Sequence, residues 1–184
     1  MSCADFSLLR SLSQVINVSK KWLGETMATA FEDPRLTLRI DDAAEYLKGL
    51  GGAGNYDVII CDSSDPVGPA AVLFELPFFQ DMKANLSPTG ILCTQGECLW
   101  LHLDLIESVL KQTRSICAHA MYAYTTIPSY PSGQIGFILG TADETNEIRC
   151  PRSEPAPSMG LRYYSKAIHE AAFVLPAFAQ EKLA

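Results

Sequence analysis

The sequence feature that most constrains the fold is a short apolar run followed by a loop that prolines keep irregular. The run is Asp57-Val-Ile-Ile-Cys61, with glycine-rich chain before it. An apolar run of this length with such borders predicts a buried parallel strand. Pro66 and Pro69 each lack a backbone donor, so the stretch 62–70 is predicted to be a loop. We therefore expect an open α/β sheet in which this loop follows the carboxyl end of a strand.

The remaining periodicity predicts a mostly parallel sheet with an antiparallel edge. The predicted strands are 35–40, 57–61, 90–95, 116–126 and 134–141. The predicted helices are 5–23, 43–50, 77–86, 100–110 and two short pieces within 163–184 that Pro176 separates. Asp5 is the expected N-cap of the first helix. Leu101, Ile106 and Val109 are expected to face inward from the helix at 100–110. The last two strands are joined by a short loop, which favours an antiparallel hairpin. Residues 142–160 are predicted to be a surface loop.

Length and charge exclude several classes of protein. With 184 residues the chain fits one domain that has room for a sizeable core. A net charge of -7 disfavours binding to the phosphates of nucleic acids. No apolar run approaches the roughly 18 residues that a transmembrane helix needs. The first ten residues lack the pattern of a secretory signal. We expect a protein that binds neither nucleic acid nor membrane.

The cysteines, histidines and glycines show no cofactor motif. The six cysteines stand at positions 3, 61, 93, 98, 117 and 150 without any CxxC spacing, and the three histidines stand at 102, 119 and 169. This pattern predicts reduced thiols, a cytoplasmic setting and no metal site. Gly51, Gly52 and Gly54 precede a strand and are not followed by a phosphate-binding lysine, so they do not predict a nucleotide-phosphate loop.

Polar side chains are expected to gather where the predicted strands end. These residues are Asp42, Asp62, Asp65, Gln95 and Tyr130. Ligands of open α/β sheets bind at the carboxyl ends of strands, and carboxylates there hold ammonium groups by charge-assisted hydrogen bonds. A carboxylate beside an amine also accepts the proton that the amine must lose before it attacks. The alternatives are a solvated turn with Asp62 as a helix cap, and a packing role for Tyr130.

Four segments in order resemble the spermidine synthase family: YDVIICDSSDPVGPA, GILCTQGECLWLHLDLI, YAYTTIPSYPSGQIGFIL and YYSKAIHEAAFVLPAFA. The similarity runs from about Val15 to the C-terminus. It implies a Rossmann-like, methyltransferase-type fold. It also implies aminopropyl transfer from decarboxylated S-adenosylmethionine, a co-substrate, to putrescine, giving spermidine and methylthioadenosine. No bound cofactor is implied. The expected partners are these small molecules and, as is usual in the family, a second copy of the chain.

The resemblance implies a role for each matched residue. Asp62 matches the catalytic aspartate that deprotonates and orients the attacking amine. The residues that match the putrescine site are Asp65, Gln95 and Tyr130. The residues that match the nucleoside part of the donor site are Asp42 and Ala43, and Ala43 stands where the family usually has glycine.

The chain also departs from the family pattern. The family's N-terminal β-domain, and the GGGDGG loop after its first Rossmann strand, have no counterpart here. The place of its acidic EID-type motif reads Arg10-Ser-Leu-Ser-Gln14. We therefore expect 1–184 to be a single partial catalytic domain in which 1–14 lies outside the family pattern. We also expect an apolar sheet edge to be exposed and binding of the aminopropyl donor to be impaired. The alternatives are a putrescine N-methyltransferase, a small-molecule binding module without turnover, and a non-catalytic truncated isoform that pairs with a full-length subunit.

Overall fold

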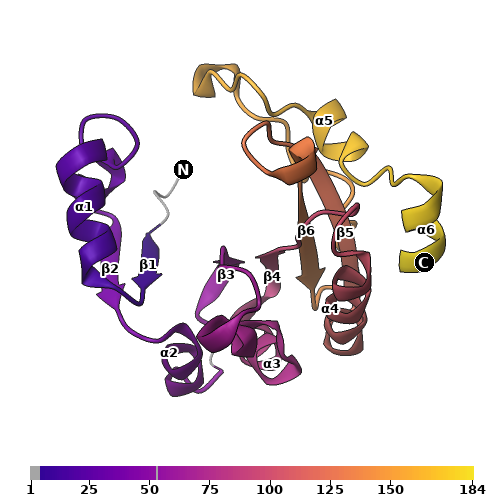
Figure 1. Cartoon of the computed structure of the whole chain (residues 1–184), viewed down its shortest axis with the longest axis horizontal. Helices are drawn as coiled ribbons and strands as arrows, with labels where there is room; N and C mark the ends of the chain where they lie inside the picture. The colour runs from indigo at the N-terminus through magenta and orange to yellow at the C-terminus, as the bar shows by residue number, and fades with distance from the viewer. Residues whose placement is uncertain (1–4, 53) are drawn as a thin grey trace. The chain divides into compact units, whose positions relative to one another are not determined.

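The computed structural model describes residues 5–52 and 54–184. It divides into two compact units, one ending at Leu50 and the other running from Gly51 to Ala184 (Figure 1). No helix among the residues described has both the length and the apolar character needed to cross a membrane.

The first unit is a parallel strand pair with helices. Its elements in chain order are β1 (Phe6–Arg10), α1 (Ser13–Leu23), the 3-10 turn η1 (Thr29–Glu32), β2 (Leu36–Ile40) and α2 (Ala43–Gly49). β1 pairs in parallel with β2, from Phe6 opposite Leu36 to Arg10 opposite Ile40. The predicted strand at 35–40 and the helix after it are confirmed.

The helix predicted over 5–23 is wrong at its start. Residues 6–10 form β1, and α1 begins only at Ser13, with Leu12 rather than Asp5 at the N-cap position. Closely spaced leucines fit a helical stripe as well as a short strand, so periodicity does not separate the two. Backbone pairing with β2 decides the conformation here.

The second unit is built on a mixed sheet with strand order β3-β4-β6-β5. Its strands are β3 (Tyr56–Cys61), β4 (Leu86–Gln95), β5 (His119–Thr126) and β6 (Gln134–Thr141). β3 and β4 are parallel, whereas β6 runs antiparallel to both β4 and β5. The parallel pair and the antiparallel edge hairpin are therefore confirmed. β4 begins earlier than the predicted strand at 90–95, because residues 86–89 also belong to it, and its register with β3 shifts there.

Strand β3 is an edge strand, and the prediction that it is buried is wrong. In the strand order it has a neighbour, β4, on one side only. Val58 is 55% exposed and Ile60 is 71% exposed. An apolar run is typical of a strand covered on both faces, yet position in the sheet decides its exposure. The exposed apolar sheet edge that the sequence predicts is present in this unit.

Helices cover one face of the second sheet. They are α3 (Leu76–Asn85), which contacts β4, and α4 (Leu103–Ile116), which contacts α3, β5 and β6. A further helix, α6 (Ala177–Leu183), packs against α4. Ile106 and Val109 are buried as predicted, but Leu101 precedes α4 and is exposed. The helix begins later than expected because the segment after β4 first makes a turn, in which the amide of Leu101 donates to the carbonyl of Cys98.

The chain from the end of β6 to Phe173 packs on the opposite face of the sheet. Ile148 and Phe173 form a buried cluster with Ala123 of β5. Residues 142–160 contain the short 3-10 turn η4 (Pro157–Met159), and the final helices α5 (Lys166–Ala171) and α6 are separated at Pro176, as predicted. The β5–β6 hairpin is thus packed against α4 on one face and against this segment on the other.

Candidate functional site

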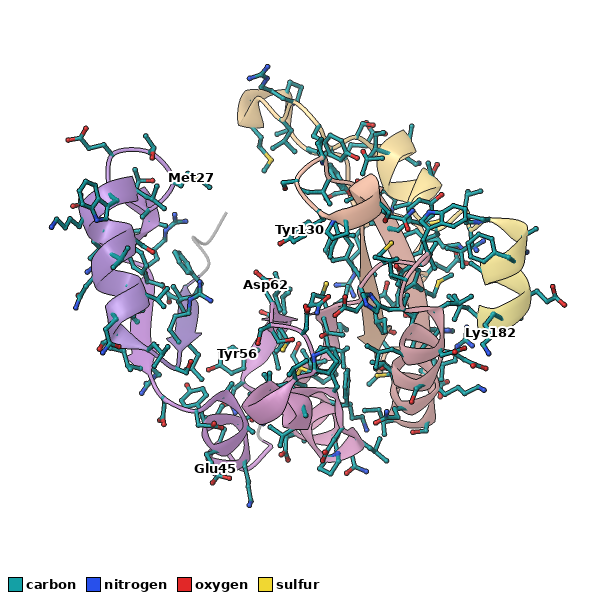
Figure 2. The ribbon with its side chains drawn as sticks, viewed as in Figure 1. Met27, Glu45, Tyr56, Asp62, Tyr130 and Lys182 are labelled. Atoms are coloured by element: carbon teal, nitrogen blue, oxygen red, sulfur yellow. The ribbon has the colours of Figure 1, made fainter. Side chains whose placement is uncertain are left out.

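Three chain segments lie at the edge of the second sheet where β3 and β4 end. Cys61 lies opposite Thr94 in the parallel pair, so Asp62 follows one strand at the level where Gln95 ends the other. β6 begins at the same edge because it runs antiparallel to β4. The loop that leads into β6 carries Tyr130, and Figure 2 shows Asp62 and Tyr130 on the same side of the second unit. The structure thus places Asp62, Gln95 and Tyr130, three residues predicted to form the site, at the same edge of the sheet.

The two carboxylates of the 62–70 loop are exposed and without partners. Within the described chain, no hydrogen bond or ion pair engages the side chain of Asp62 or of Asp65. The backbone turns at Asp65, whose carbonyl accepts from the amide of Val67 at 2.6 Å. The alternative that Asp62 caps a helix is wrong, because the 3-10 turn η2 (Gly68–Phe74) has Val67 at its N-cap position. Both carboxylates are free to receive a cationic ligand.

Two partly buried thiols, those of Cys61 and Cys93, lie close to Asp62. The pKa of Cys61 is raised mainly by burial, and burial raises the pKa of Cys93 to about 11. The negative charge of Asp62 raises both pKa values further. These thiols therefore stay protonated near neutral pH and do not act as nucleophiles.

Sequence reasoning missed the partner of Gln95, which is Glu97. The Gln95 amide nitrogen Nε2 donates to Glu97 Oε1 at 3.0 Å, and Gln95 Oε1 accepts from the Glu97 backbone N–H at 2.9 Å. On its other side, Glu97 Oε2 lies 3.2 Å from His102 Nδ1. The only signal in the sequence was a charged residue two positions past the end of the strand.

The turn that carries Gln95 is joined to the start of β6. The amide of Gly96 donates to the Gly136 carbonyl, and the amide of Gly136 donates to the Glu97 carbonyl, both at 2.7 Å. Cys98 Sγ lies 2.7 Å from the hydroxyl of Ser132, which belongs to the 3-10 turn η3 (Pro131–Gly133). These contacts fix the β5–β6 loop against the end of β4.

Tyr130 sits at the beginning of η3, and its side chain projects outward. Its amide donates to the Ile127 carbonyl, and its carbonyl accepts from the Gly133 amide at 3.0 Å. The side chain is 54% exposed, so a purely packing role is not supported. The backbone holds the ring in place while its surface is left for a ligand.

Asp42 and Ala43 belong to the first unit. Asp42 is the N-cap of α2, and one carboxylate oxygen accepts from the amides of Ala44 and Glu45 at 2.9 and 3.1 Å. A carboxylate at this position satisfies amides that the helix itself leaves unpaired. Its contact with a nucleoside is not tested by this geometry and remains a prediction.

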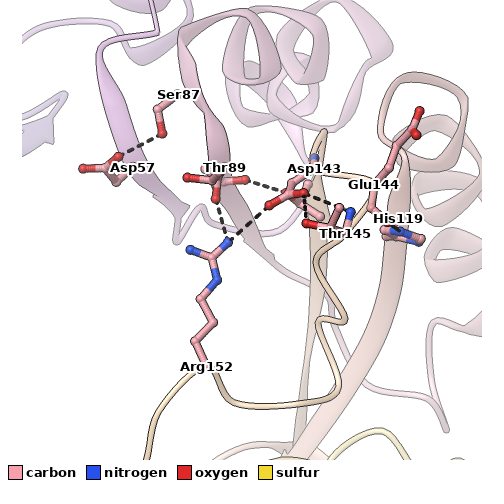
Figure 3. A network of polar contacts seen from close by, with 10 residues as sticks. Asp57, Ser87, Thr89, His119, Asp143, Glu144, Thr145 and Arg152 are labelled. Atoms are coloured by element: carbon pink, nitrogen blue, oxygen red, sulfur yellow. Dashed lines mark hydrogen bonds and ion pairs between the residues drawn. The ribbon is translucent and has the colours of Figure 1, made fainter.

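A separate cavity of about 360 Å³ lies near the opposite end of the second sheet. It is lined by Thr89, Asp143, Thr145, Asn146, Glu147, Cys150, Pro151 and Arg152. Arg152 donates to the Thr89 carbonyl at 2.8 Å, and Asp143 accepts from the backbone amide of Thr145 at 2.9 Å (Figure 3). This network ties the chain after β6 to β4. The cavity shares no lining residue with the sheet edge that carries Asp62, Asp65, Gln95 and Tyr130, which we call the acidic edge.

No metal centre is recognisable in the residues that are described. Within 5–52 and 54–184, no three His, Cys, Asp or Glu side chains are grouped so that they could hold a metal ion.

Comparison with known proteins identifies relatives over most of the chain. A family model described as the spermine/spermidine synthase domain matches residues 13–149. Spermidine synthase 1 of Pisum sativum is 42% identical over 179 residues, which is 92% of this chain and 53% of the relative. Spermidine synthase of Schizosaccharomyces pombe is 39% identical and covers 97% of this chain, with 60% of its own length matched. The chain thus spans little more than half the length of these curated relatives.

Solved structures agree with the sequence comparison. A spermidine synthase crystallised with the transition-state analogue AdoDATO superposes with a TM-score of 0.83 at 25% identity, covering 99% of this chain and 62% of that one. Human methyltransferase-like protein 13 in complex with SAH matches with a TM-score of 0.58 at 19% identity, over 97% of this chain and 71% of that one. The second likeness concerns the fold alone and confirms its Rossmann-like, methyltransferase type.

Proposed function

The chain belongs to the spermine/spermidine synthase family, and from this premise we propose that it carries the amine-activating part of an aminopropyltransferase site. The proposed reaction moves an aminopropyl group from decarboxylated S-adenosylmethionine to putrescine and yields spermidine and methylthioadenosine. The observation that carries the proposal is the acidic edge itself. Two exposed carboxylates without partners follow β3 where Gln95 and Tyr130 also lie.

In this proposal, Asp62 accepts a proton from the attacking nitrogen of putrescine. An alkylammonium has no lone pair, so loss of that proton creates the nucleophile. The nitrogen then attacks the carbon next to the donor's sulfonium, a C–N bond forms, the C–S bond breaks, and its electron pair neutralises the sulfur. Holding the two reactants in line supplies most of the acceleration. No covalent intermediate with the protein is needed.

The remaining residues of the edge would hold the other end of the diamine. Asp65 is proposed to bind the far ammonium by a charge-assisted hydrogen bond. Gln95 and Tyr130 complete this end of the site, and Gln95 acts through a water. A diamine with two cationic ends suits two carboxylates three positions apart along one loop.

The donor side is proposed with fewer residues. Asp42 is proposed to bind the adenine amino group, with Ala43 beside it. Because the 184 residues contain no GGGDGG loop, we propose that these residues by themselves bind the donor weakly. A cytoplasmic setting, a homodimer and the absence of a bound cofactor are part of the proposal.

The test is a transfer assay with a matched control. The chain is incubated with putrescine and decarboxylated S-adenosylmethionine, and spermidine and methylthioadenosine are measured. Asp62→Asn should lower the rate by about 10²–10⁴-fold, the range that a positioned general base contributes. Asp57→Asn, at the other end of the same strand, should leave it unchanged. Absence of turnover by the unsubstituted chain, or equal rates for it and Asp62→Asn, would refute the proposal.

A parallel reaction with S-adenosylmethionine separates the two donor classes. Formation of N-methylputrescine in place of spermidine would assign the chain to putrescine N-methyltransferases and overturn the aminopropyl assignment.

A further inference from the structure

We infer that Glu97 is a positioning residue that locks the side-chain amide of Gln95 in one orientation for the diamine. The inference rests on the proposed function in that Gln95 is taken as part of the diamine site. It adds a residue to which neither the sequence analysis nor the family resemblance gave a role.

The contacts between Glu97 and Gln95 admit only one orientation of the amide. Gln95 Oε1 accepts from the Glu97 backbone N–H at 2.9 Å, and Gln95 Nε2 donates to the Glu97 carboxylate at 3.0 Å. Rotating the amide by half a turn would place its NH₂ against an N–H and its oxygen against a carboxylate. Both hydrogen bonds would then become repulsive contacts. The locked amide keeps one N–H and one lone pair for a ligand or a water.

The backbone of Glu97 adopts a conformation that favours glycine. Its φ is 56°, in the left-handed region that other residues rarely adopt. The carbonyl is held there by the amide of Gly136 at 2.7 Å and by the hydroxyl of Tyr122 at 3.1 Å. A glycine would make the same backbone contacts with less strain. A strained non-glycine residue at such a site suggests that its side chain has a function.

The surroundings of the Glu97 side chain fit a positioning role. The residue is only 8% exposed, so little of its carboxylate is open to solvent. One oxygen is occupied by Gln95 and the other faces His102 Nδ1 at 3.2 Å. With both oxygens engaged, Glu97 acts on a ligand through Gln95 rather than by direct contact.

Two variants separate positioning from a direct effect of charge. Glu97→Gly keeps the backbone contacts and removes the side chain, whereas Glu97→Gln keeps an acceptor for the Gln95 amide and removes the charge. If Glu97 positions Gln95, Glu97→Gln should behave much like the unsubstituted chain and Glu97→Gly should not. If its charge acts on the diamine, the two variants should be equally impaired. Glu144→Gln, at the other end of the sheet, is the control.

The first measurement needs no ligand. In ¹H–¹⁵N spectra of the full chain, the two Gln95 side-chain amide protons should be well separated, because one of them is bonded to a carboxylate. They should move toward the positions of a free glutamine in Glu97→Gly and remain near their original positions in Glu97→Gln. Unchanged Gln95 resonances in Glu97→Gly would overturn the inference.

The second measurement is a double-mutant cycle on putrescine affinity. Gln95→Ala and Glu97→Gly should each weaken binding roughly tenfold, the scale of one hydrogen bond to a charged group. Because Glu97 acts through Gln95, the double variant should bind no more weakly than Gln95→Ala alone. An additive loss of roughly a hundredfold would show that Glu97 acts on the diamine independently and would overturn the inference.

Failure of the proposed function is distinguishable from failure of this inference. If the unsubstituted chain does not bind putrescine, the diamine site is refuted. The Gln95 resonances still report on whether Glu97 holds the amide.

Discussion

A methyl group added at Gly136 should disrupt the link between β6 and the turn that carries Glu97. A Cβ at this position would lie 2.5 Å from Tyr122 Cε2 and closer still to Cζ and Oη of the same ring. Tyr122 is 3% exposed, so the ring has no solvent-filled space into which to move. Gly136→Ala therefore forces displacement of a buried side chain whose hydroxyl donates to the Glu97 carbonyl.

Two contributions set the loss of unfolding free energy that we expect for Gly136→Ala. Forcing extra volume into a packed core costs about 1–3 kcal/mol. Loss of the Tyr122 hydrogen bond adds about 1 kcal/mol, because the Glu97 carbonyl keeps the Gly136 amide as a partner and is not left unsatisfied. Gly136→Ala should therefore lower the free energy of unfolding by about 2–4 kcal/mol. Tyr122→Phe, which loses only the hydroxyl, should cost about 1 kcal/mol.

Urea denaturation followed by circular dichroism measures the free energies of unfolding of Gly136→Ala and Tyr122→Phe. A double-mutant cycle tests whether the Tyr122 ring is the obstacle to the added methyl group. Tyr122→Leu lacks the three ring atoms that the new methyl group would meet. In that background, Gly136→Ala should cost less than about 1 kcal/mol, which gives a coupling energy of at least about 1 kcal/mol. An equal cost of Gly136→Ala in both backgrounds would show that Tyr122 is not the obstacle and would refute this reasoning.

Two further predictions concern the thiols and the exposed strand. Burial raises the pKa of Cys93 and of Cys117 to about 11, so the folded state holds these protons more tightly than the unfolded state. Urea denaturation at a series of pH values should therefore show the full contribution of these thiols to stability below about pH 8.5 and a decline toward pH 11. A free energy of unfolding that rises over this range would contradict the assignment. Ile60 is 71% exposed on an edge strand, so Ile60→Lys should change the free energy of unfolding by less than about 0.5 kcal/mol. Light scattering should show that the variant aggregates less, because a charge on an edge strand opposes pairing with another chain. A large loss of stability would instead show that Ile60 is covered.

The sequence was informative where local pattern and sheet position agree. The run that forms β3, the antiparallel hairpin of β5 and β6, and the break at Pro176 follow from turn chemistry and apolar spacing. The gathering of Asp62, Gln95 and Tyr130 at one edge followed from the general rule for the carboxyl ends of parallel strands.

The failures arise where tertiary contacts override local pattern. Leu8 and Leu9 fit a helical stripe, but pairing with β2 makes them part of a strand. Val58 and Ile60 look like residues of a buried strand, but the strand order places them at an edge. The Glu97–Gln95 pair depends on a left-handed backbone at Glu97, which nothing in the residue type indicates, since such a conformation usually signals glycine.

The most direct test of the account is to map putrescine on the chain by ¹H–¹⁵N chemical-shift changes during a titration. We expect the changes to concentrate at four residues, Asp62, Asp65, Gln95 and Tyr130. We also expect the double substitution Asp62→Asn and Asp65→Asn to abolish them. Changes that centre instead on the cavity of Asp143 and Arg152, or that survive loss of both carboxylates, would contradict the claim that the acidic edge binds the diamine.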